Sequence, residues 1–315
     1  MSWYVPFLVF YEILNIGMFY IRLDGSPNYA MMCNATAAIL NILLNYIFIF
    51  EFGWGMMGAA FATSLGTVVG GLMTLVYLMH YSHDLRLYRI KLSRKSLRMT
   101  FRNIGYMVKL GNSAFVSEAS IACMMFLGNY VFIRNLGEDG VAAFSIVCYF
   151  FPIIFMVYNA IAQSAQPIIS YNFGAGQPER IRKALRLSLR TALICGICFF
   201  ILTTLCCRNI VALFIDRSYS AFDIAVNGIP YFGIGFIFFA INMIGIGYYQ
   251  SIERGQRATI ITLLRGVVFM LIGFFVLPPI LGVPGIWLAV PSAELLTTLY
   301  IIGIYFKDRF IVRRR

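Results

Sequence analysis

The chain has 315 residues, of which 60% are hydrophobic and only 12% are charged, and its formal net charge is +12. A mean hydropathy of +0.80 excludes a soluble globular domain, which needs far more polar surface. The positive charge does not indicate nucleic acid as a partner, because the basic residues gather in the segments between apolar stretches.

Nine apolar stretches follow one another along the chain, each close to the ~20 residues that a membrane-spanning helix needs. They are Trp3–Tyr20, Met31–Phe50, Met57–Leu78, Leu110–Ile133, Val141–Ile161, Leu187–Cys207, Ile229–Tyr249, Ile260–Leu281 and Gly285–Phe306. We therefore predict an all-α polytopic membrane protein with nine transmembrane helices in the lipid bilayer.

The basic residues are distributed asymmetrically around these stretches. If the nine helices alternate in direction, 22 of the 25 Lys and Arg residues fall on one side. Only Arg134, Arg208 and Arg217 fall on the other, and Arg265 is assigned here to the loop after the seventh stretch. By the positive-inside rule the C-terminus is cytoplasmic and the N-terminus lies outside.

Neither a metal site nor an enzyme is predicted. The seven cysteines all lie in or at the ends of apolar stretches, without a histidine beside them. Both histidines, His80 and His83, lie at one predicted helix end, and no helix carries a nucleophile paired with a base. We expect neither catalysis nor a cofactor.

The beginning and the end of the chain resemble each other. The pattern Gly55-x-x-Gly58-x-x-x-Ala62 matches Gly282-x-x-Gly285-x-x-x-Ala289, and each follows an acid–Gly turn and a long apolar helix. Both triplets of helices start outside, which indicates a parallel repeat. If the last three stretches close a six-helix half, the first three close an earlier half, and we expect three further helices before Met1.

This 6+6 arrangement predicts the domain organisation. Residues 1–80 form a partial N-lobe, 81–105 a cytoplasmic linker between lobes, 106–306 a C-lobe of six helices, and 307–315 a basic cytoplasmic tail.

Three acids lie well inside apolar stretches: Glu12, Glu118 and Glu294. An ionised acid at the centre of a membrane helix costs about 2.5–3.5 kcal/mol on insertion scales. We expect no Lys or Arg at comparable depth to neutralise them, so each is a functional-site candidate. Glu118 lies about ten residues into its helix, hence ~15 Å deep. The alternative, a neutral acid that only hydrogen-bonds a neighbouring helix, stays open for each.

Amides and aromatic residues accompany these acids. Most membrane amides form structural hydrogen bonds between helices, and Asn41 and Asn45 lie one turn apart on one face. A few can line a wet cavity for substrate. The candidates for that cavity are Asn112, Phe115, Tyr149, Asn159 and Asn242.

Several segments resemble one family in the same order. "AQPIISYNFGAGQPERIRKAL" (Ala165–Leu185) is similar to the end of the eighth helix of MATE (multidrug and toxic compound extrusion) transporters. "AILNILLNYIFIFEFGWGMMGAAFAT" resembles the fifth and sixth helices, and the segment from Leu263 to Thr297 resembles the eleventh and twelfth. "LGNSAFVSEAS" is similar to the seventh helix in the MepA-like branch. The resemblance covers essentially the whole chain.

The resemblance implies a function. Members of this family are twelve-helix antiporters that export amphipathic or cationic drugs against inward H⁺ or Na⁺, by alternating access between two lobes. This chain matches helices four to twelve. Glu118 lies on the matching seventh helix and is the leading coupling residue, with Glu294 and Glu12 as further candidates. The implied protein is a monomer when full length, in the bacterial cytoplasmic membrane, with no cofactor besides the coupling ion.

Two alternatives stay open. One is a flippase for lipid-linked substrates from the same superfamily, for which more cationic residues would be expected within the cavity helices. The other is an inactive fragment of a transporter, since an incomplete N-lobe is expected to transport poorly.

The charge asymmetry predicts the orientation of the C-terminus. A reporter that is active only in the cytoplasm is expected to be active when fused after Arg315. Activity at that position only of a reporter that requires the outside would contradict the predicted orientation.

Overall fold

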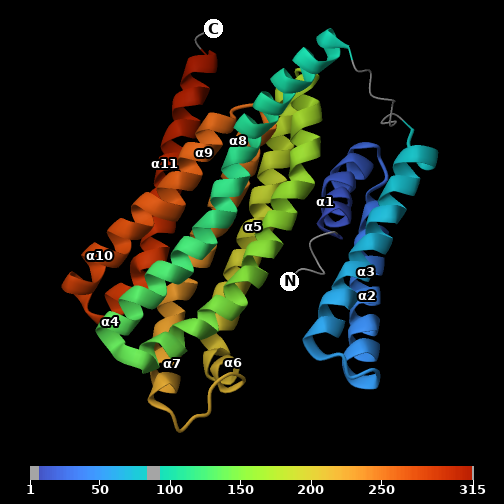
Figure 1. Cartoon of the computed structure of the whole chain (residues 1–315). Helices are drawn as coiled ribbons and strands as arrows, with labels where there is room; N and C mark the ends of the chain where they lie inside the picture. The colour runs from blue at the N-terminus through green and yellow to red at the C-terminus, as the bar shows by residue number, and fades with distance from the viewer. Residues whose placement is uncertain (1–6, 84–92, 314–315) are drawn as a thin grey trace. The chain divides into compact units, whose positions relative to one another are not determined.

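The computed structural model describes residues 7–83 and 93–313, and within these ranges the chain is helical without a strand. The chain divides into two compact units, unit 1 (Met1–Ser96) and unit 2 (Leu97–Arg315) (Figure 1). The division falls inside the predicted linker, whose exact bounds stay a prediction. Several predicted features lie outside the described residues: the start of the first stretch at Trp3, and the basic residues Arg86, Arg89, Lys91, Arg314 and Arg315.

Unit 1 is a bundle of three helices. They are α1 (Leu8–Leu23), α2 (Pro27–Tyr46) with its π-helical continuation η2 (Ile47–Glu51), and α3 (Gly55–Val76) with its π-helical continuation η3 (Tyr77–Tyr81). The turn between α1 and α2 is fixed by the buried carboxylate of Asp24, which accepts hydrogen bonds from Tyr77 Oη (3.0 Å) and the His83 backbone N–H (2.9 Å). These two hydrogen bonds tie the turn to η3 and to the residues that follow it.

The predicted face of amides in α2 is confirmed. Asn45 Nδ2 donates to Asn41 Oδ1 at 3.1 Å, and Asn41 Nδ2 donates to Thr63 Oγ1 in α3 at 3.0 Å. The pair therefore fastens two helices of unit 1, in the way that most amides in membrane helices do.

Unit 2 contains the remaining helices. They are α4 (Arg94–Gly174), α5 (Pro178–Leu205), α6 (Cys207–Ala212), α7 (Ser220–Gly233), α8 (Gly235–Ser251), α9 (Gly255–Leu263), the π-helical η4 (Leu264–Val268), α10 (Phe269–Leu281) and α11 (Val283–Arg313).

Helix α4 covers two predicted spans. Its 81 residues would measure ~120 Å if straight, several times the ~30 Å of a bilayer core. The helix turns back at Gly137, whose φ of 68° and ψ of −156° are not helical (Figure 1). The predicted stretches Leu110–Ile133 and Val141–Ile161 lie on either side of this turn.

The described part of the chain holds six helices that are long and apolar enough to cross a membrane. The count becomes seven if α7 and α8, which meet at a 42° bend, form one span. The all-α membrane fold class is confirmed, whereas the number of nine spans stays a prediction.

The helix that contains the sixth apolar stretch begins before that stretch does. The turn at Gly176, with a φ of +66°, is followed by α5 with Pro178 in its first turn, a position that favours proline. The helix starts at Pro178 whereas the apolar stretch starts at Leu187, so the basic residues Arg180 to Arg190 lie on the helix rather than in a connecting loop. Long basic side chains tolerate this position because they can extend to the membrane surface.

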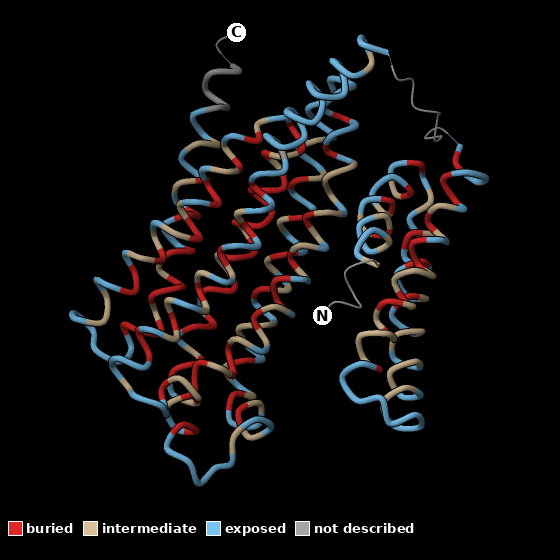
Figure 2. The backbone as a smooth tube through the Cα atoms, viewed as in Figure 1, coloured by how far each residue is buried: buried red, intermediate tan, exposed pale blue. Residues whose placement is uncertain are grey.

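Two apolar clusters form the core of unit 2, a large one that contains Trp287 and a smaller one that contains Tyr249 and Ile301. Figure 2 shows buried residues along the inward faces of its helices and exposed residues at its outer faces and connecting loops. Trp287 of α11 is 1% exposed, packs edge-on against Phe132 at 4.8 Å between ring centroids, and covers Gly228 of α7. The exposed faces carry many large apolar side chains, a composition that fits contact with lipid rather than with water.

A chain of amides connects the two halves of α4 to α8. Gln166 Nε2 donates to Gln250 Oε1 at 2.7 Å, and Gln250 Nε2 donates to Ser113 Oγ at 2.8 Å. Ser113 precedes the Gly137 turn and Gln166 follows it, so α8 holds both halves of α4 through one side chain.

The repeat seen in the sequence has a counterpart in the backbone. Gly55 and Gly282 both have positive φ, +52° and +64°, at the turn that precedes the last helix of each triplet. Three residues later, a Cβ on Gly58 or Gly285 would lie 2.9 Å or 2.3 Å from the preceding helix. Only glycine suits both requirements.

Gly273 of α10 is expected to be essential for packing against α11. A Cβ there would lie 2.5 Å from the backbone oxygen of Ala289. Gly273→Ala is therefore expected to lower the free energy of unfolding by about 1–3 kcal/mol, measured by thermal denaturation in detergent.

The matched control is Gly303→Ala in α11, where a Cβ meets nothing within 4 Å. The control is expected to leave stability unchanged or slightly raised, because Ala favours the helix more than Gly does. Equal effects of the two substitutions would contradict the packing role of Gly273.

Candidate functional site

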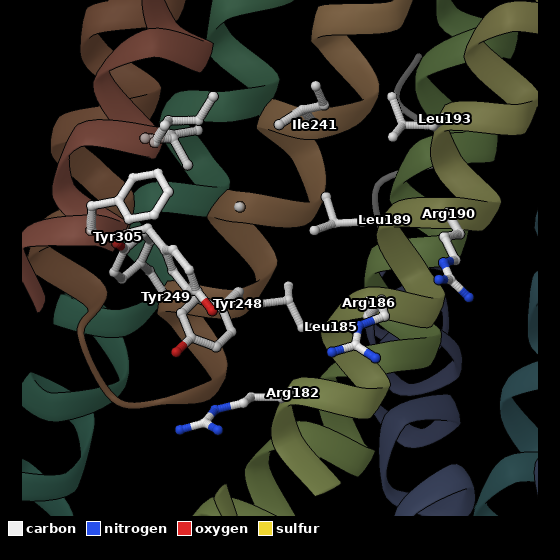
Figure 3. Close-up of a pocket in the computed structure, with 14 residues that line it drawn as sticks. Arg182, Leu185, Arg186, Leu189, Arg190, Leu193, Ile241, Tyr248, Tyr249 and Tyr305 are labelled. Atoms are coloured by element: carbon white, nitrogen blue, oxygen red, sulfur yellow. The ribbon is translucent and has the colours of Figure 1, made fainter. Parts of the chain in front are cut away.

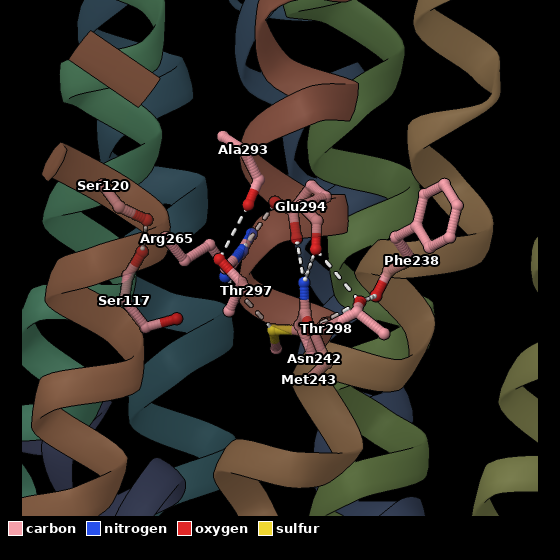
Figure 4. A network of polar contacts seen from close by, with 10 residues as sticks. All are labelled: Ser117, Ser120, Phe238, Asn242, Met243, Arg265, Ala293, Glu294, Thr297 and Thr298. Carbon is pink, nitrogen blue, oxygen red and sulfur yellow. Dashed lines mark hydrogen bonds and ion pairs between the residues drawn. The ribbon is translucent and has the colours of Figure 1, made fainter. Parts of the chain in front are cut away.

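An ion pair lies buried inside unit 2. Arg265 Nε of η4 donates to Glu294 Oε1 of α11 at 2.6 Å (Figure 4). The two residues are 3% and 2% exposed. The pair explains how an apolar helix accommodates Glu294, because Arg265 is the counter-ion of its carboxylate.

The second oxygen of the same carboxylate is also satisfied. Asn242 Nδ2 of α8 donates to Glu294 Oε2 at 2.7 Å and to the Glu294 backbone oxygen at 2.8 Å. Thr298 Oγ1, one turn further along α11, donates to Asn242 Oδ1 at 3.0 Å. We call Arg265, Glu294, Asn242 and Thr298 the buried polar network; it joins α8, η4 and α11 (Figure 4).

The guanidinium of Arg265 has further partners. Its central carbon lies 4.2 Å from the ring centroid of Phe239, and its Nη1 lies 3.7 Å from Met243 Sδ. An arginine over an aromatic face gains additional stabilisation when it is removed from water. The guanidinium of Arg265 is thus contacted by Phe239 and Met243 of α8 as well as by the carboxylate of Glu294.

Local helix geometry places Arg265 in this network. A π-helical turn inserts one extra residue into a helix, and such turns often occur at functional positions. Gly266, next to Arg265, lies so close to α4 that a Cβ would be 2.2 Å from the Ser120 side chain. The close contact with α4 and the π-turn together set the position of η4 between its neighbours.

The prediction for Arg265 was wrong. It is the eleventh residue of the apolar helix Gly255–Leu281, about 15 Å from the start at a helical rise of 1.5 Å per residue. The expectation that no Lys or Arg lies at the depth of the three acids is therefore corrected. A buried arginine is tolerated because Glu294 neutralises it, and 21 basic residues remain on the predicted cytoplasmic side.

The sequence carried a signal for this pair. Arg265 falls six residues into the predicted stretch Ile260–Leu281, with apolar residues on both sides. A membrane acid that needs a partner, with a basic residue at similar depth in the preceding stretch, indicates a pair between neighbouring helices.

The network limits what Glu294 can do. Both carboxylate oxygens are occupied, so another cation can bind there only by displacing Arg265. Breaking a buried pair leaves an uncompensated charge and costs several kcal/mol. The arrangement suits the fastening of three helices better than the exchange of ions.

Three other candidates share one exposed face of α4. Asn112, Phe115 and Glu118 are exposed, and their spacing of three residues keeps them on neighbouring positions of the helix surface. The opposite face carries the buried residues Ser113, Ser117, Ser120 and Met124, which point into unit 2. Among the described residues no hydrogen bond or ion pair satisfies the carboxylate of Glu118.

The remaining candidates are dispersed. Glu12 lies on an exposed face of α1 in unit 1. Tyr149 is exposed and stacks on Phe214 at 5.8 Å, and Asn159 is half-buried. Asn242 is fully buried in the polar network, so the structure brings it to Glu294 and not to a cavity. In this structure the five predicted cavity residues do not line one common site.

The family model MatE matches residues 113–282. Multidrug export protein MepA of Staphylococcus aureus (strain bovine RF122 / ET3-1) is 25% identical over 318 residues, covering 98% of this chain and 66% of the relative. The protein of the same name from Staphylococcus saprophyticus is 25% identical over 315 residues with the same coverage. The chain thus spans just under two thirds of the length of these relatives.

Solved structures share the fold. A crystal structure of MATE in complex with MaL6 has a TM-score of 0.86 at 21% identity, covering 99% of this chain and 70% of that chain. A MOP superfamily transporter from Pyrococcus furiosus, described as having a binding pocket of reverse polarity, has a TM-score of 0.84 at 21% identity, covering 96% and 67%.

The ion pair of the buried polar network predicts a non-additive response to substitution. Arg265→Gln alone and Glu294→Gln alone are each expected to lower the free energy of unfolding by about 3–5 kcal/mol, because each leaves one charge buried without a partner. The double variant is expected to lose clearly less than the sum of the two. Thermal unfolding of the purified chain in detergent measures this coupling.

The control pair is Glu179 and Arg182 on α5, also in contact at 2.7 Å but with side chains 82% and 48% exposed. Their replacement by Gln is expected to change stability little. Additive losses at Arg265 and Glu294 would show that the two charges do not stabilise each other.

Proposed function

Because the chain belongs to the MatE family and is similar along its length to MepA exporters, we propose that it acts in the secondary active efflux of amphipathic or cationic drugs. The proposed driving force is the inward movement of H⁺ or Na⁺, with alternating access between two lobes. The observation that carries the proposal is the carboxylate of Glu118, which lies on a membrane-spanning helix with no cationic partner among the residues that the structure describes.

Glu118 has the surroundings that a cationic amphiphile requires. Phe115, 72% exposed, lies one turn away on the same face of α4, and Asn112 lies one further turn away. An aromatic face and a carboxylate together attract an organic cation more strongly than either does alone. The membrane setting strengthens this attraction, because few water molecules compete for the charge.

Exchange of ions at Glu118 would couple the two transported species. The ionised carboxylate attracts Na⁺ or a cationic drug, and a bound proton removes that attraction. Drug and coupling ion then compete for one group, and the protein needs only to expose this group to each side in turn. This competition is the proposed chemical step of antiport.

The buried polar network supports a different role for Glu294. Its carboxylate already has Arg265 and Asn242 as partners, at 2.6 Å and 2.7 Å. We therefore assign it to the fastening of α8, η4 and α11 rather than to the exchange of cations. Glu12, exposed on α1, remains a candidate for a second exchanging group in unit 1.

The presence of Arg265 bears on the flippase alternative. A flippase that selects an anionic lipid-linked substrate is expected to expose cationic side chains on the helices that line its cavity. Arg265 is a cation within a span, yet it is 3% exposed and paired with Glu294. Its charge is thus not offered to a substrate, and drug efflux remains the preferred function.

Glu118→Gln is expected to weaken the binding of a drug cation. Tetraphenylphosphonium should bind to Glu118→Gln with roughly tenfold or more lower affinity than to the unmodified chain, because the substitution removes the negative charge and keeps the shape of the side chain. Radioligand binding to the purified proteins in detergent measures the affinity.

Glu179→Gln is the matched control, since it removes an exposed acid at the start of α5, outside the proposed site. It is expected to bind like the unmodified chain. A Glu118→Gln protein that keeps its affinity for the cation would contradict the role of Glu118, and the same measurement on Glu12→Gln would then test the remaining candidate.

A further inference from the structure

A second site in unit 2 lies away from the buried polar network and from Glu118. A cavity of about 540 Å³ opens between α5, α8 and α11 (Figure 3). This volume is in the range of pockets that hold small ligands. We call it the α5–α8–α11 groove.

One wall of the groove is formed by α5, which contributes a row of leucines and a parallel row of arginines. Leu185, Leu189 and Leu193 recur every four residues and line the interior. Arg182, Arg186 and Arg190 recur with the same spacing beside them, and the basic row extends ~12 Å along the helix axis.

The opposite wall is aromatic at one end and aliphatic at the other. Tyr248 and Tyr249 of α8 and Tyr305 of α11 face the level of Arg182 and Arg186, whereas Ile241 faces the level of Leu193 (Figure 3). Tyrosine and arginine are typical of the membrane surface, and Leu and Ile are typical of its interior. The groove is thus polar at one end and apolar at the other, as an amphiphile is.

The charges in the groove select the sign of the ligand. Among the described side chains that line it there are three arginines and no carboxylate. Arg182 is paired with Glu179 at 2.7 Å, but Arg186 and Arg190 have no carboxylate partner among the residues that the structure describes. A cationic drug would be repelled here, and an anion would be attracted.

We propose that the α5–α8–α11 groove binds one anionic phospholipid. The phosphate lies between Arg182 and Arg186, whose side chains extend toward the tyrosine wall in Figure 3, and an acyl chain follows the leucine row toward Ile241. Basic pockets between membrane helices suit lipid head groups, and arginine binds phosphate with two parallel hydrogen bonds. By the predicted topology this lipid belongs to the cytoplasmic leaflet. The proposal does not depend on drug efflux.

The test compares two double variants with the same loss of charge. Arg182→Gln/Arg186→Gln removes the head-group contacts, and Arg180→Gln/Lys183→Gln removes two exposed charges of α5 that do not line the groove. Native mass spectrometry of the purified chain, titrated with phosphatidylglycerol and with phosphatidylcholine, measures the lipid that stays bound.

The unmodified chain and the control variant are expected to retain one phosphatidylglycerol in preference to phosphatidylcholine. The groove variant is expected to bind phosphatidylglycerol roughly thirty-fold more weakly, which corresponds to about five- to sixfold per arginine removed. Leu189→Trp, which leaves all the charges and fills the apolar part, is expected to lose the lipid as well, with an unchanged gel-filtration profile.

Three outcomes would overturn the proposal. Equal losses in the two double variants would show general attraction to a basic surface. Retention of the lipid in Leu189→Trp would exclude the groove as the binding site of the acyl chain. Displacement of the lipid by millimolar inorganic phosphate would indicate a site for free anions.

Discussion

Inside a bilayer there is no water to hydrogen-bond a charged side chain or a backbone peptide group, so each must find its partner within the protein. This constraint determines both the fold and the buried polar network. Backbone groups are satisfied within helices, so the described residues form helices and no strand. Charges must be satisfied between helices, and Arg265 with Glu294 does so at 2.6 Å. The same requirement explains the amide chain from Ser113 to Gln166, in which each polar side chain meets another.

Glu118 and Glu294, the two acids of unit 2 that lie well inside apolar stretches, illustrate opposite solutions to this constraint. Glu294 has a partner for each oxygen and is 2% exposed, which makes it part of the framework. Glu118 lies on the exposed face of α4 with no partner among the described residues, which leaves its charge available to a mobile ion. The framework and the proposed site of exchange thus lie on different helices, so that a change of charge at Glu118 need not disturb the contacts that hold α8, η4 and α11 together.

The sequence alone predicted much of this. Apolar stretches identified the helical membrane fold, and glycine spacing identified the turns at Gly55 and Gly282. It misplaced Arg265, because a charge was taken to mark a loop, and it placed Asn242 among the few amides that line a cavity for substrate. In the structure each of these polar residues is satisfied by a side chain far away in the sequence, 29 residues from Arg265 and 52 from Asn242. The π-turn at η4 likewise lies against α4, where Gly266 meets Ser120, and no local pattern reveals this contact.

Arg265 and Glu294 lie on consecutive spans, Gly255–Leu281 and Val283–Lys307, joined at Gly282. This has a consequence for biogenesis. A lone charge entering the membrane from the translocon costs about 2.5–3.5 kcal/mol at the centre of a helix, whereas two opposite charges entering as a helical hairpin largely neutralise each other. The close contact of Gly273 with Ala289 suits such a hairpin. We therefore expect stable insertion of the Arg265 span to require synthesis of the Glu294 span, so that these two spans enter the membrane as a single unit of assembly.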